Sequence, residues 1–252
     1  MSNKRRLRKR LADLDTEDEI EPIEVHSKNT QKNQSKELTI KNKFALNEVH
    51  TTALDLCMYE KTKMVFIDGP AGSCKSFISV LAALNLLQQK KIKKIIYIRS
   101  IVESAEKSIG ALPGELDEKF KPWSLPLLDK LHELIPPFQI DTLMESGQIQ
   151  CIPVNFVRGL TFHDAAVIVD ESQNNSYQEE VTILTRFGHN TRYFVIGDTK
   201  QTDTHKSGFK SVLERFSDEE CQEHGIYVCH FGENEIVRSK ILRLITRKLN
   251  VS

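Results

Sequence analysis

The sequence predicts an α/β fold in which helices cover both faces of a parallel β-sheet. From residue 37 onward, short runs of β-branched and other apolar residues alternate with longer amphipathic stretches. This alternation is typical of parallel strands joined by helices. A glycine-rich segment also follows the first apolar run directly, and ligands of such folds bind at the carboxyl ends of strands.

Six strands and five helices are expected in chain order. The expected strands cover residues 64–68, 94–98, 149–154, 166–170, 192–197 and 225–229. The expected helices cover residues 75–88, 117–135, 177–187, 209–216 and 233–249. Five prolines fall between residues 112 and 137. A helix there should be broken or start late, because proline removes a backbone donor and clashes with the preceding turn.

The last expected helix is apolar on one side and basic on the other. We expect its apolar side to pack on the sheet and its charged side to face solvent, with binding of RNA or DNA along the basic side as the alternative. The apolar residues are Ile236, Val237, Ile241, Leu244, Ile245 and Leu249, and the basic ones are Arg238, Lys240, Arg243, Arg247 and Lys248.

Length and composition indicate one cytoplasmic α/β domain with a tail. The chain has 252 residues, 39% of them hydrophobic, and a formal net charge of +0, so any attraction to nucleic acid must be local. Its five cysteines form no CxxC pair and no zinc-like cluster, which fits a reducing compartment. No apolar run approaches the roughly 20 residues that span a bilayer, and no apolar stretch follows the basic N-terminus as in a secretory signal.

The first 35 residues are expected to be a disordered charged tail, and residues 36–252 the folded domain. A basic block over residues 4–10 precedes an acidic block over residues 13–24, and a polar run follows. No structural period of apolar residues is present there. Two interpretations stay open: the basic block binds nucleic acid, or the segment is a solubilising tail neutralised by its own acidic part.

The glycine-rich segment has the setting of a phosphate-binding loop. It lies between the apolar strand 64–68 and a helix with apolar residues at helical spacing. Glycines allow backbone amides to approach phosphate oxygens, and the free amides at a helix start favour an anion. This strand–loop–helix order makes the match credible. The expected phosphate-binding residues are Gly69, Pro70, Ala71, Gly72, Ser73, Cys74, Lys75 and Ser76.

Three residues of this loop have separate expected roles. Lys75 can reach the β- and γ-phosphates, and the Ser76 hydroxyl can ligate Mg²⁺. Cys74 stands where the usual motif has glycine, so its side chain could crowd the loop and slow turnover. It also lies at a helix start beside a lysine, a setting that lowers the pKa of a thiol, and its oxidation or alkylation would then block nucleotide binding.

Two further strand ends carry candidate catalytic groups. The apolar run 166–169 ends in Asp170 and Glu171. At a strand end near a phosphate loop, Asp170 would hold Mg²⁺ and Glu171 would polarise the attacking water. The strand 192–197 is followed by Gln201, which could sense the γ-phosphate or position water, although this segment taken alone favours a polar turn after a core strand.

Taken together, these segments resemble the PhoH-like family of P-loop ATPases, whose core is similar to superfamily-one helicases. The resemblance runs from about residue 65 to residue 249. It implies a RecA-like P-loop fold. The family-like segments are residues 98–103, 110–116, 119–123, 126–129, 158–159, 170–174, 185–188, 197–203 and 237–239.

The resemblance also implies roles that the residues alone do not. ATP would be the substrate and Mg²⁺ the cofactor. Gln173 would link the metal site to the γ-phosphate sensor. Arg238, or else Arg186, would be an arginine finger supplied to a neighbouring copy in a hexameric ring, and such a finger is worth roughly 10³–10⁵ in rate. The glutamine that contacts adenine in such ATPases has no counterpart, since only Asn47 and His50 lie near its place.

Three functions remain open from the sequence. The first is an ATPase coupled to remodelling of RNA or single-stranded DNA, although no second motor domain is visible. The second is a nucleotide-dependent switch or scaffold with little turnover, which Cys74 would suit. The third is a small-molecule kinase, which the Asp170–Glu171 pair disfavours because water activation fits hydrolysis better than transfer.

Overall fold

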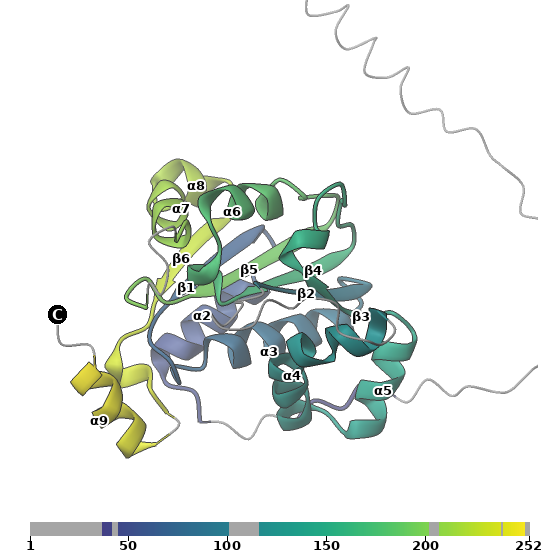
Figure 1. The fold of residues 1–252 in the computed structure, drawn as a ribbon, viewed down its shortest axis with the longest axis horizontal. Helices are drawn as coiled ribbons and strands as arrows, with labels where there is room; N and C mark the ends of the chain where they lie inside the picture. Colours follow the sequence, from purple (N-terminus) through teal and green to yellow (C-terminus); the bar gives the residue numbers. More distant parts are fainter. Residues whose placement is uncertain (1–36, 42–44, 101–115, 202–206, 238, 250–252) are drawn as a thin grey trace, which may run out of the picture. The chain divides into compact units, whose positions relative to one another are not determined.

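The structure is a computed structural model, which describes residues 37–41, 45–100, 116–201, 207–237 and 239–249 (Figure 1). The predicted disordered tail, residues 1–35, lies outside these ranges, as do residues 101–103, 110–115, 202–203 and 238 of the family-like segments.

Six parallel strands form one sheet in the order β3-β2-β4-β5-β1-β6. The prediction of a parallel α/β sheet is therefore confirmed, and each predicted strand is found with its ends within one residue. The strands are β1 Met64–Asp68, β2 Lys94–Arg99, β3 Ile149–Pro153, β4 Ala165–Asp170, β5 Thr191–Gly197 and β6 Ile226–His230.

Helices cover both faces of this sheet (Figure 1). One face carries α2 Glu48–Met58, α3 Lys75–Gln88, α4 Leu116–Leu134 and α5 Pro137–Glu145. The other face carries α6 Tyr177–Leu184, α7 Phe209–Arg215 and α8 Glu219–Glu223. Three short 3-10 turns, η1 Val154–Phe156, η2 Ser172–Asn174 and η3 Glu233–Glu235, and the C-terminal helix α9 Lys240–Leu249 complete the described elements.

Alternation along the strands divides the apolar core into two layers. On β1, Val65 and Ile67 join the core beneath α2 and α3, whereas Met64 and Phe66 join the core beneath α6 and α7. Successive side chains of a strand point to opposite faces, and a parallel sheet buried on both faces needs apolar residues at every position. The near-continuous apolar strands of the sequence are thus explained.

Helix α4 differs from the prediction, because it runs unbroken through Pro122 and Pro126. Each proline removes one helical hydrogen bond. Leu127, Leu131 and Leu134 are buried in the same core as α3. Their burial offsets the lost hydrogen bonds and keeps the helix continuous.

The predicted single helix over residues 233–249 is wrong in two respects. The chain forms η3, then an extended stretch at Ile236, and only afterwards α9. Moreover, the apolar side of α9 does not pack on the sheet: Ile241, Leu244 and Ile245 are 60%, 40% and 44% exposed. Ile236 of the extended stretch is buried, and the Val237 amide donates to the Gly72 carbonyl oxygen at 3.3 Å. The chain therefore contacts the glycine-rich loop before α9 begins.

Candidate functional site

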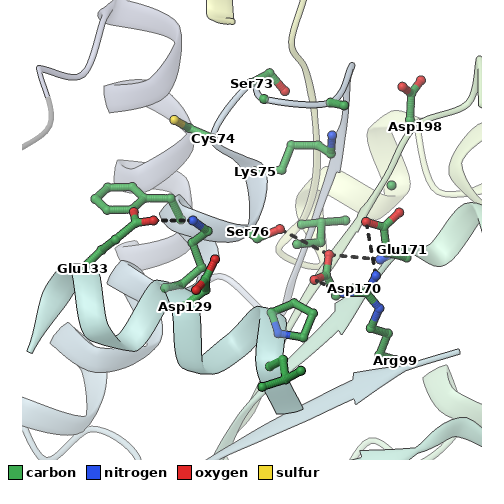
Figure 2. A pocket seen from close by; sticks show the side chains of 18 of the residues that line it. Ser73, Cys74, Lys75, Ser76, Arg99, Asp129, Glu133, Asp170, Glu171 and Asp198 are labelled. Carbon is green, nitrogen blue, oxygen red and sulfur yellow. Dashed lines mark hydrogen bonds and ion pairs between the residues drawn. The ribbon is translucent and has the colours of Figure 1, made fainter. Parts of the chain in front are cut away.

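The strand order brings the three predicted chemical segments to one edge of the sheet. Strand β5 lies between β1 and β4, and all three are parallel, so their carboxyl ends meet there. A cleft of about 830 Å³ opens at this edge. It is lined by the glycine-rich loop, by the ends of β4 and β5, and by one side of α4 (Figure 2).

The backbone of the loop requires glycine at two positions. A Cβ atom on Gly69 would lie 2.7 Å from the Cβ atom and 2.9 Å from the carbonyl oxygen of Phe231. Gly72 has a φ of +79°, in the left-handed region that glycine adopts at least cost. Cys74, where the usual motif has glycine, also has a left-handed φ of 66°. The residue is therefore held in a conformation that glycine would adopt more readily.

Helix α2, which the sequence did not predict, supports this loop from behind. The buried His50 ring places Nε2 3.2 Å from the Ser73 carbonyl oxygen, and the Ser73 hydroxyl donates to the Pro70 carbonyl at 2.7 Å. Asn47 caps α2 and donates from Nδ2 to Glu235 at 3.1 Å. Asn47 and His50 are the residues near the place where an adenine-contacting glutamine is expected. In the structure, His50 contacts the phosphate loop and Asn47 contacts the segment after β6.

Lys75 is folded back onto its own loop. Its Nζ donates to the carbonyl oxygens of Gly69 and Pro70, the latter at 3.0 Å. Burial lowers the pKa of Lys75, while nearby carboxylates, Asp198 and Glu171 first among them, act in the opposite direction. The Lys75 side chain therefore lies within its own loop, with Nζ held by two carbonyl oxygens and close to the carboxylates of the cleft.

Ser76 and Asp170 lie together where the loop meets β4. The Ser76 hydroxyl donates to Asp170 Oδ1 at 3.2 Å, and Tyr97 of β2 donates to Asp170 Oδ2 at 2.5 Å. Burial raises the pKa of Tyr97, so this phenol stays a proton donor. A hydroxyl and a carboxylate facing the same cleft are oxygen ligands that Mg²⁺ prefers, so these residues fit that ion.

Gln173 connects the ends of β4 and β5. Its Nε2 donates to Glu171 Oε2, and its Oε1 accepts from the backbone amide of Asp198 at 3.1 Å. Glu171 has a left-handed φ of 55°. Burial raises the pKa of Asp198, against the lowering effects of the Lys200 amide and the Lys75 charge. The Gln173 side chain thus links the Glu171 carboxylate to the backbone of Asp198.

Asp68 fixes the spacing between the loop and β5. It accepts hydrogen bonds from the Thr199 amide at 2.8 Å and from the Thr199 hydroxyl at 2.9 Å, and His230 Nδ1 lies 3.3 Å from Asp68 Oδ2. The carboxylate therefore joins the ends of β1, β5 and β6 directly behind the phosphate loop.

The structure brings five predicted site residues to one cleft and places one of the two candidate arginines elsewhere. Lys75, Ser76, Asp170, Glu171 and Gln201 all line the cleft. Arg238 lies outside the described residues. Arg186 instead donates from Nε to the Thr182 carbonyl oxygen at the end of α6.

No role was expected from the sequence for Tyr97, Arg99, Asp68 or Thr199. Asp68, Tyr97 and Arg99 are at or near the carboxyl ends of β1 and β2, and Thr199 directly follows the β5 end. Position at a strand end was thus the available signal. It becomes specific only once the order of strands is known.

Comparison with known proteins identifies a family. The family described as PhoH-like protein matches residues 45–250. The chain belongs to the PhoH-like family. The resemblance drawn from the motifs is therefore confirmed.

Curated PhoH-like relatives share about a third of their residues with this chain. A PhoH-like protein of Synechocystis sp. is 36% identical over 74% of the chain and 56% of its own length. One from Bacillus subtilis is 37% identical over 74% of the chain and 58% of its own length. Protein PhoH of Escherichia coli K12 is 34% identical over 72% and 51%. The chain thus spans little more than half the length of these relatives.

Membrane-crossing helices are absent from the described part of this PhoH-like chain. None of its described helices is both long and apolar enough to span a bilayer. Its five cysteines are all free thiols.

Proposed function

We propose that this PhoH-like chain binds ATP with Mg²⁺ and hydrolyses it. The observation that carries the proposal is that two segments far apart in the chain meet, because the Ser76 hydroxyl lies 3.2 Å from Asp170 Oδ1. This contact brings Lys75, the neighbour of Ser76, and Glu171, the neighbour of Asp170, to the same place. Lys75, Ser76, Asp170 and Glu171 thus line one cleft, which supports roles in phosphate binding, metal binding and general-base catalysis.

Each residue has a role in the proposed reaction. The amides at the start of α3 and the Lys75 ammonium group would hold the β- and γ-phosphates. Ser76 and Asp170 would hold Mg²⁺, which supplies charge neutralisation to the phosphates. Glu171 would orient a water molecule and accept its proton, and Gln201, on the far side of the cleft, would contact the γ-phosphate. Water as acceptor makes the reaction a hydrolysis rather than a kinase transfer.

Coupling to RNA or single-stranded DNA, in the cytoplasm, is the cellular role that we propose for this hydrolysis. Helicase-like motif order supports it. The exposed apolar side of α9 supports assembly of several copies, and a ring would place Arg238 of one copy near the nucleotide of the next. A hexamer is the assembly that we propose.

A switch with little turnover is the second candidate. Two observations favour it: the left-handed Cys74 in the loop, and the Lys75 ammonium group bound to its own loop carbonyls. Such a protein would bind ATP, change its assembly, and hydrolyse the nucleotide slowly.

Phosphate release and nucleotide binding together separate these candidates. We would measure steady-state release from Mg²⁺·ATP with and without single-stranded RNA, and ATP affinity by calorimetry, for wild type and Lys75→Ala. Lys210→Ala, an exposed lysine on α7, is the matched control. We expect hydrolysis that Lys75→Ala reduces at least about 100-fold and Lys210→Ala leaves unchanged. ATP binding without hydrolysis would favour the switch, and no ATP binding by folded wild type would refute both.

A further inference from the structure

Arg99 approaches the two acids of β4 from the side opposite the phosphate loop. It is the last residue of β2, in register with Asp170. Strand β2 borders β4 on one side, whereas β5 and then β1 lie on the other. Figure 2 accordingly shows Arg99 and Lys75 on opposite sides of Asp170 and Glu171. Any attraction by Arg99 therefore draws a carboxylate away from the loop.

The guanidinium group of Arg99 pairs with both acids. Nη2 lies 3.8 Å from Glu171 Oε1, and Nη1 lies 3.9 Å from Asp170 Oδ2. The second oxygen of Glu171 accepts from Gln173 Nε2. Both carboxylate oxygens of Glu171 are thus directed at protein groups. A general base must instead direct an oxygen at the attacking water.

We propose that Arg99 is a positioning residue that holds Glu171 in a resting orientation, and that ATP turnover requires this ion pair to open. The inference rests on the proposed hydrolysis. Asp170 needs no such release, because Ser76 and Tyr97 each donate a hydrogen bond to one of its two oxygens. The restraint therefore acts on the base and leaves the metal-binding carboxylate in place.

The pair is weak enough to open during a catalytic cycle. The side chains of Arg99 and Glu171 are 28% and 38% exposed, and half-exposed ion pairs at this separation contribute little net free energy. The left-handed backbone of Glu171 is strained, so a movement of this segment that opens the ion pair can also relieve the strain. Removing the guanidinium should accordingly raise the basal rate by about 3- to 10-fold.

The kinetic test compares three variants with wild type in the absence of nucleic acid. Arg99→Gln removes the charge and keeps most of the side-chain length, and Arg99→Lys keeps the charge. Tyr97→Phe removes the hydrogen bond to Asp170 and is the matched comparison on the same strand. We expect Arg99→Gln to raise kcat about 3- to 10-fold with KM for ATP within about twofold, and Arg99→Lys to stay near wild type.

The contrasting variant should behave differently. Tyr97→Phe should raise the Mg²⁺ concentration needed for half-maximal rate without raising kcat. A fall in kcat for Arg99→Gln, or an unchanged kcat, would overturn the proposal, because it would place the guanidinium on the reaction side of the acids. The unfolding temperature of each variant is measured as well, and values equal to that of wild type show that a change in kcat does not come from a loss of folded protein.

A crystal structure of Arg99→Gln separates this inference from the proposed function. If wild type binds no ATP, the proposed function fails, yet the restraint still predicts that the Glu171 carboxylate turns toward Lys75 in the variant. A carboxylate that stays in its wild-type orientation would refute the restraint whatever the activity. If wild type binds ATP without turnover, Arg99→Gln should show turnover, and its continued absence would also refute the restraint.

Discussion

Left-handed backbone occurs at two non-glycine residues of the site. Cys74 has a φ of 66° at the end of the phosphate loop, and Glu171 has a φ of 55° just after β4. For residues with a Cβ atom this conformation costs about 1–2 kcal/mol. Both residues are adjacent to groups that we propose to bind phosphate or metal. Backbone strain therefore occurs at the phosphate loop and at the proposed general base, where it fixes the orientation of the adjacent groups.

Substitution of Cys74 separates backbone strain from the thiol. Cys74→Gly and Cys74→Ala both remove the sulfur, but only alanine keeps a Cβ atom in the left-handed region. We expect Cys74→Gly to be more stable than Cys74→Ala by about 1 kcal/mol, as measured by urea denaturation. Equal stabilities would show that the loop relaxes when the thiol is removed.

Glu180 is a buried carboxyl group on the face of the sheet away from the phosphate loop helix. Its Oε1 accepts from Asn175 Nδ2 at 2.9 Å, and the Ser172 side chain also forms a hydrogen bond with this carboxyl group. Burial raises the pKa of Glu180 to about 7 from an ordinary value of 4.5, against the lowering effect of the Asn175 hydrogen bond.

The raised pKa of Glu180 predicts a pH-dependent stability. Below about pH 4.5 the group is protonated in both states, so it costs nothing. As the pH rises from about 4.5 to about 7, the unfolded chain loses this proton while the folded chain keeps it, so stability falls, and above about 7 the loss stays constant. Glu180→Gln should therefore be more stable than wild type at pH 8 by roughly 1–3 kcal/mol, with the difference vanishing near pH 4.5.

Thermal unfolding at several pH values checks this expectation. Each 1 kcal/mol should change the unfolding temperature by about 2–4 °C for a chain of this size. Glu223→Gln, an exposed glutamate of α8, should show no such pH-dependent difference. A constant difference between Glu180→Gln and wild type across the whole range would argue that Glu180 stays ionised in the folded protein.

Among the elements, α2 is the one that fixes the phosphate loop most directly. At its C-terminal end, Arg192 of β5 donates to the carbonyl oxygens of Cys57, Tyr59 and Glu60. At its N-terminal end, Asn47 accepts from the His50 amide at 2.9 Å. The helix is thus held at both ends, and its His50 ring reaches the Ser73 carbonyl.

Loss of the Asn47 cap should weaken the fold modestly. Asn47→Ala removes the cap and the hydrogen bond to Glu235, and we expect a loss of about 1–2 kcal/mol in unfolding free energy. Thr52→Ala, an exposed position on the same helix, should change stability by less than about 0.5 kcal/mol. Urea denaturation of both variants tests this prediction. Equal losses of unfolding free energy in the two variants would mean that the Asn47 cap does not stabilise the fold.

At the scale of the whole molecule, α9 has an apolar side that the described monomer leaves exposed. Ile241, Leu244 and Ile245 lie on this side. If copies assemble through it, Ile241→Glu with Ile245→Glu should shift the protein toward monomers without lowering its unfolding temperature as a monomer. Val49→Glu, a partly exposed apolar position on α2, is the control. Analytical ultracentrifugation measures the outcome, and an unchanged assembly would exclude this side as the contact.

By itself, the sequence determined the elements that depend on local pattern. Apolar runs marked all six strands, and the glycine-rich turn before Lys75 marked the start of α3, because hydrophobic periodicity and turn chemistry are local properties. It did not indicate α2 or α5, or the unbroken path of α4 through two prolines. Those depend on burial against α3 and the sheet, which one segment cannot reveal.

Only the tertiary structure decided which strand ends face one another. Residues 76 and 170 are far apart in the chain, and their hydrogen bond exists because β5 lies between β1 and β4. The same strand order places Arg99 beside Asp170 and Glu171. Pattern within a segment cannot fix strand order, because the order depends on how all helices share the two faces of the sheet.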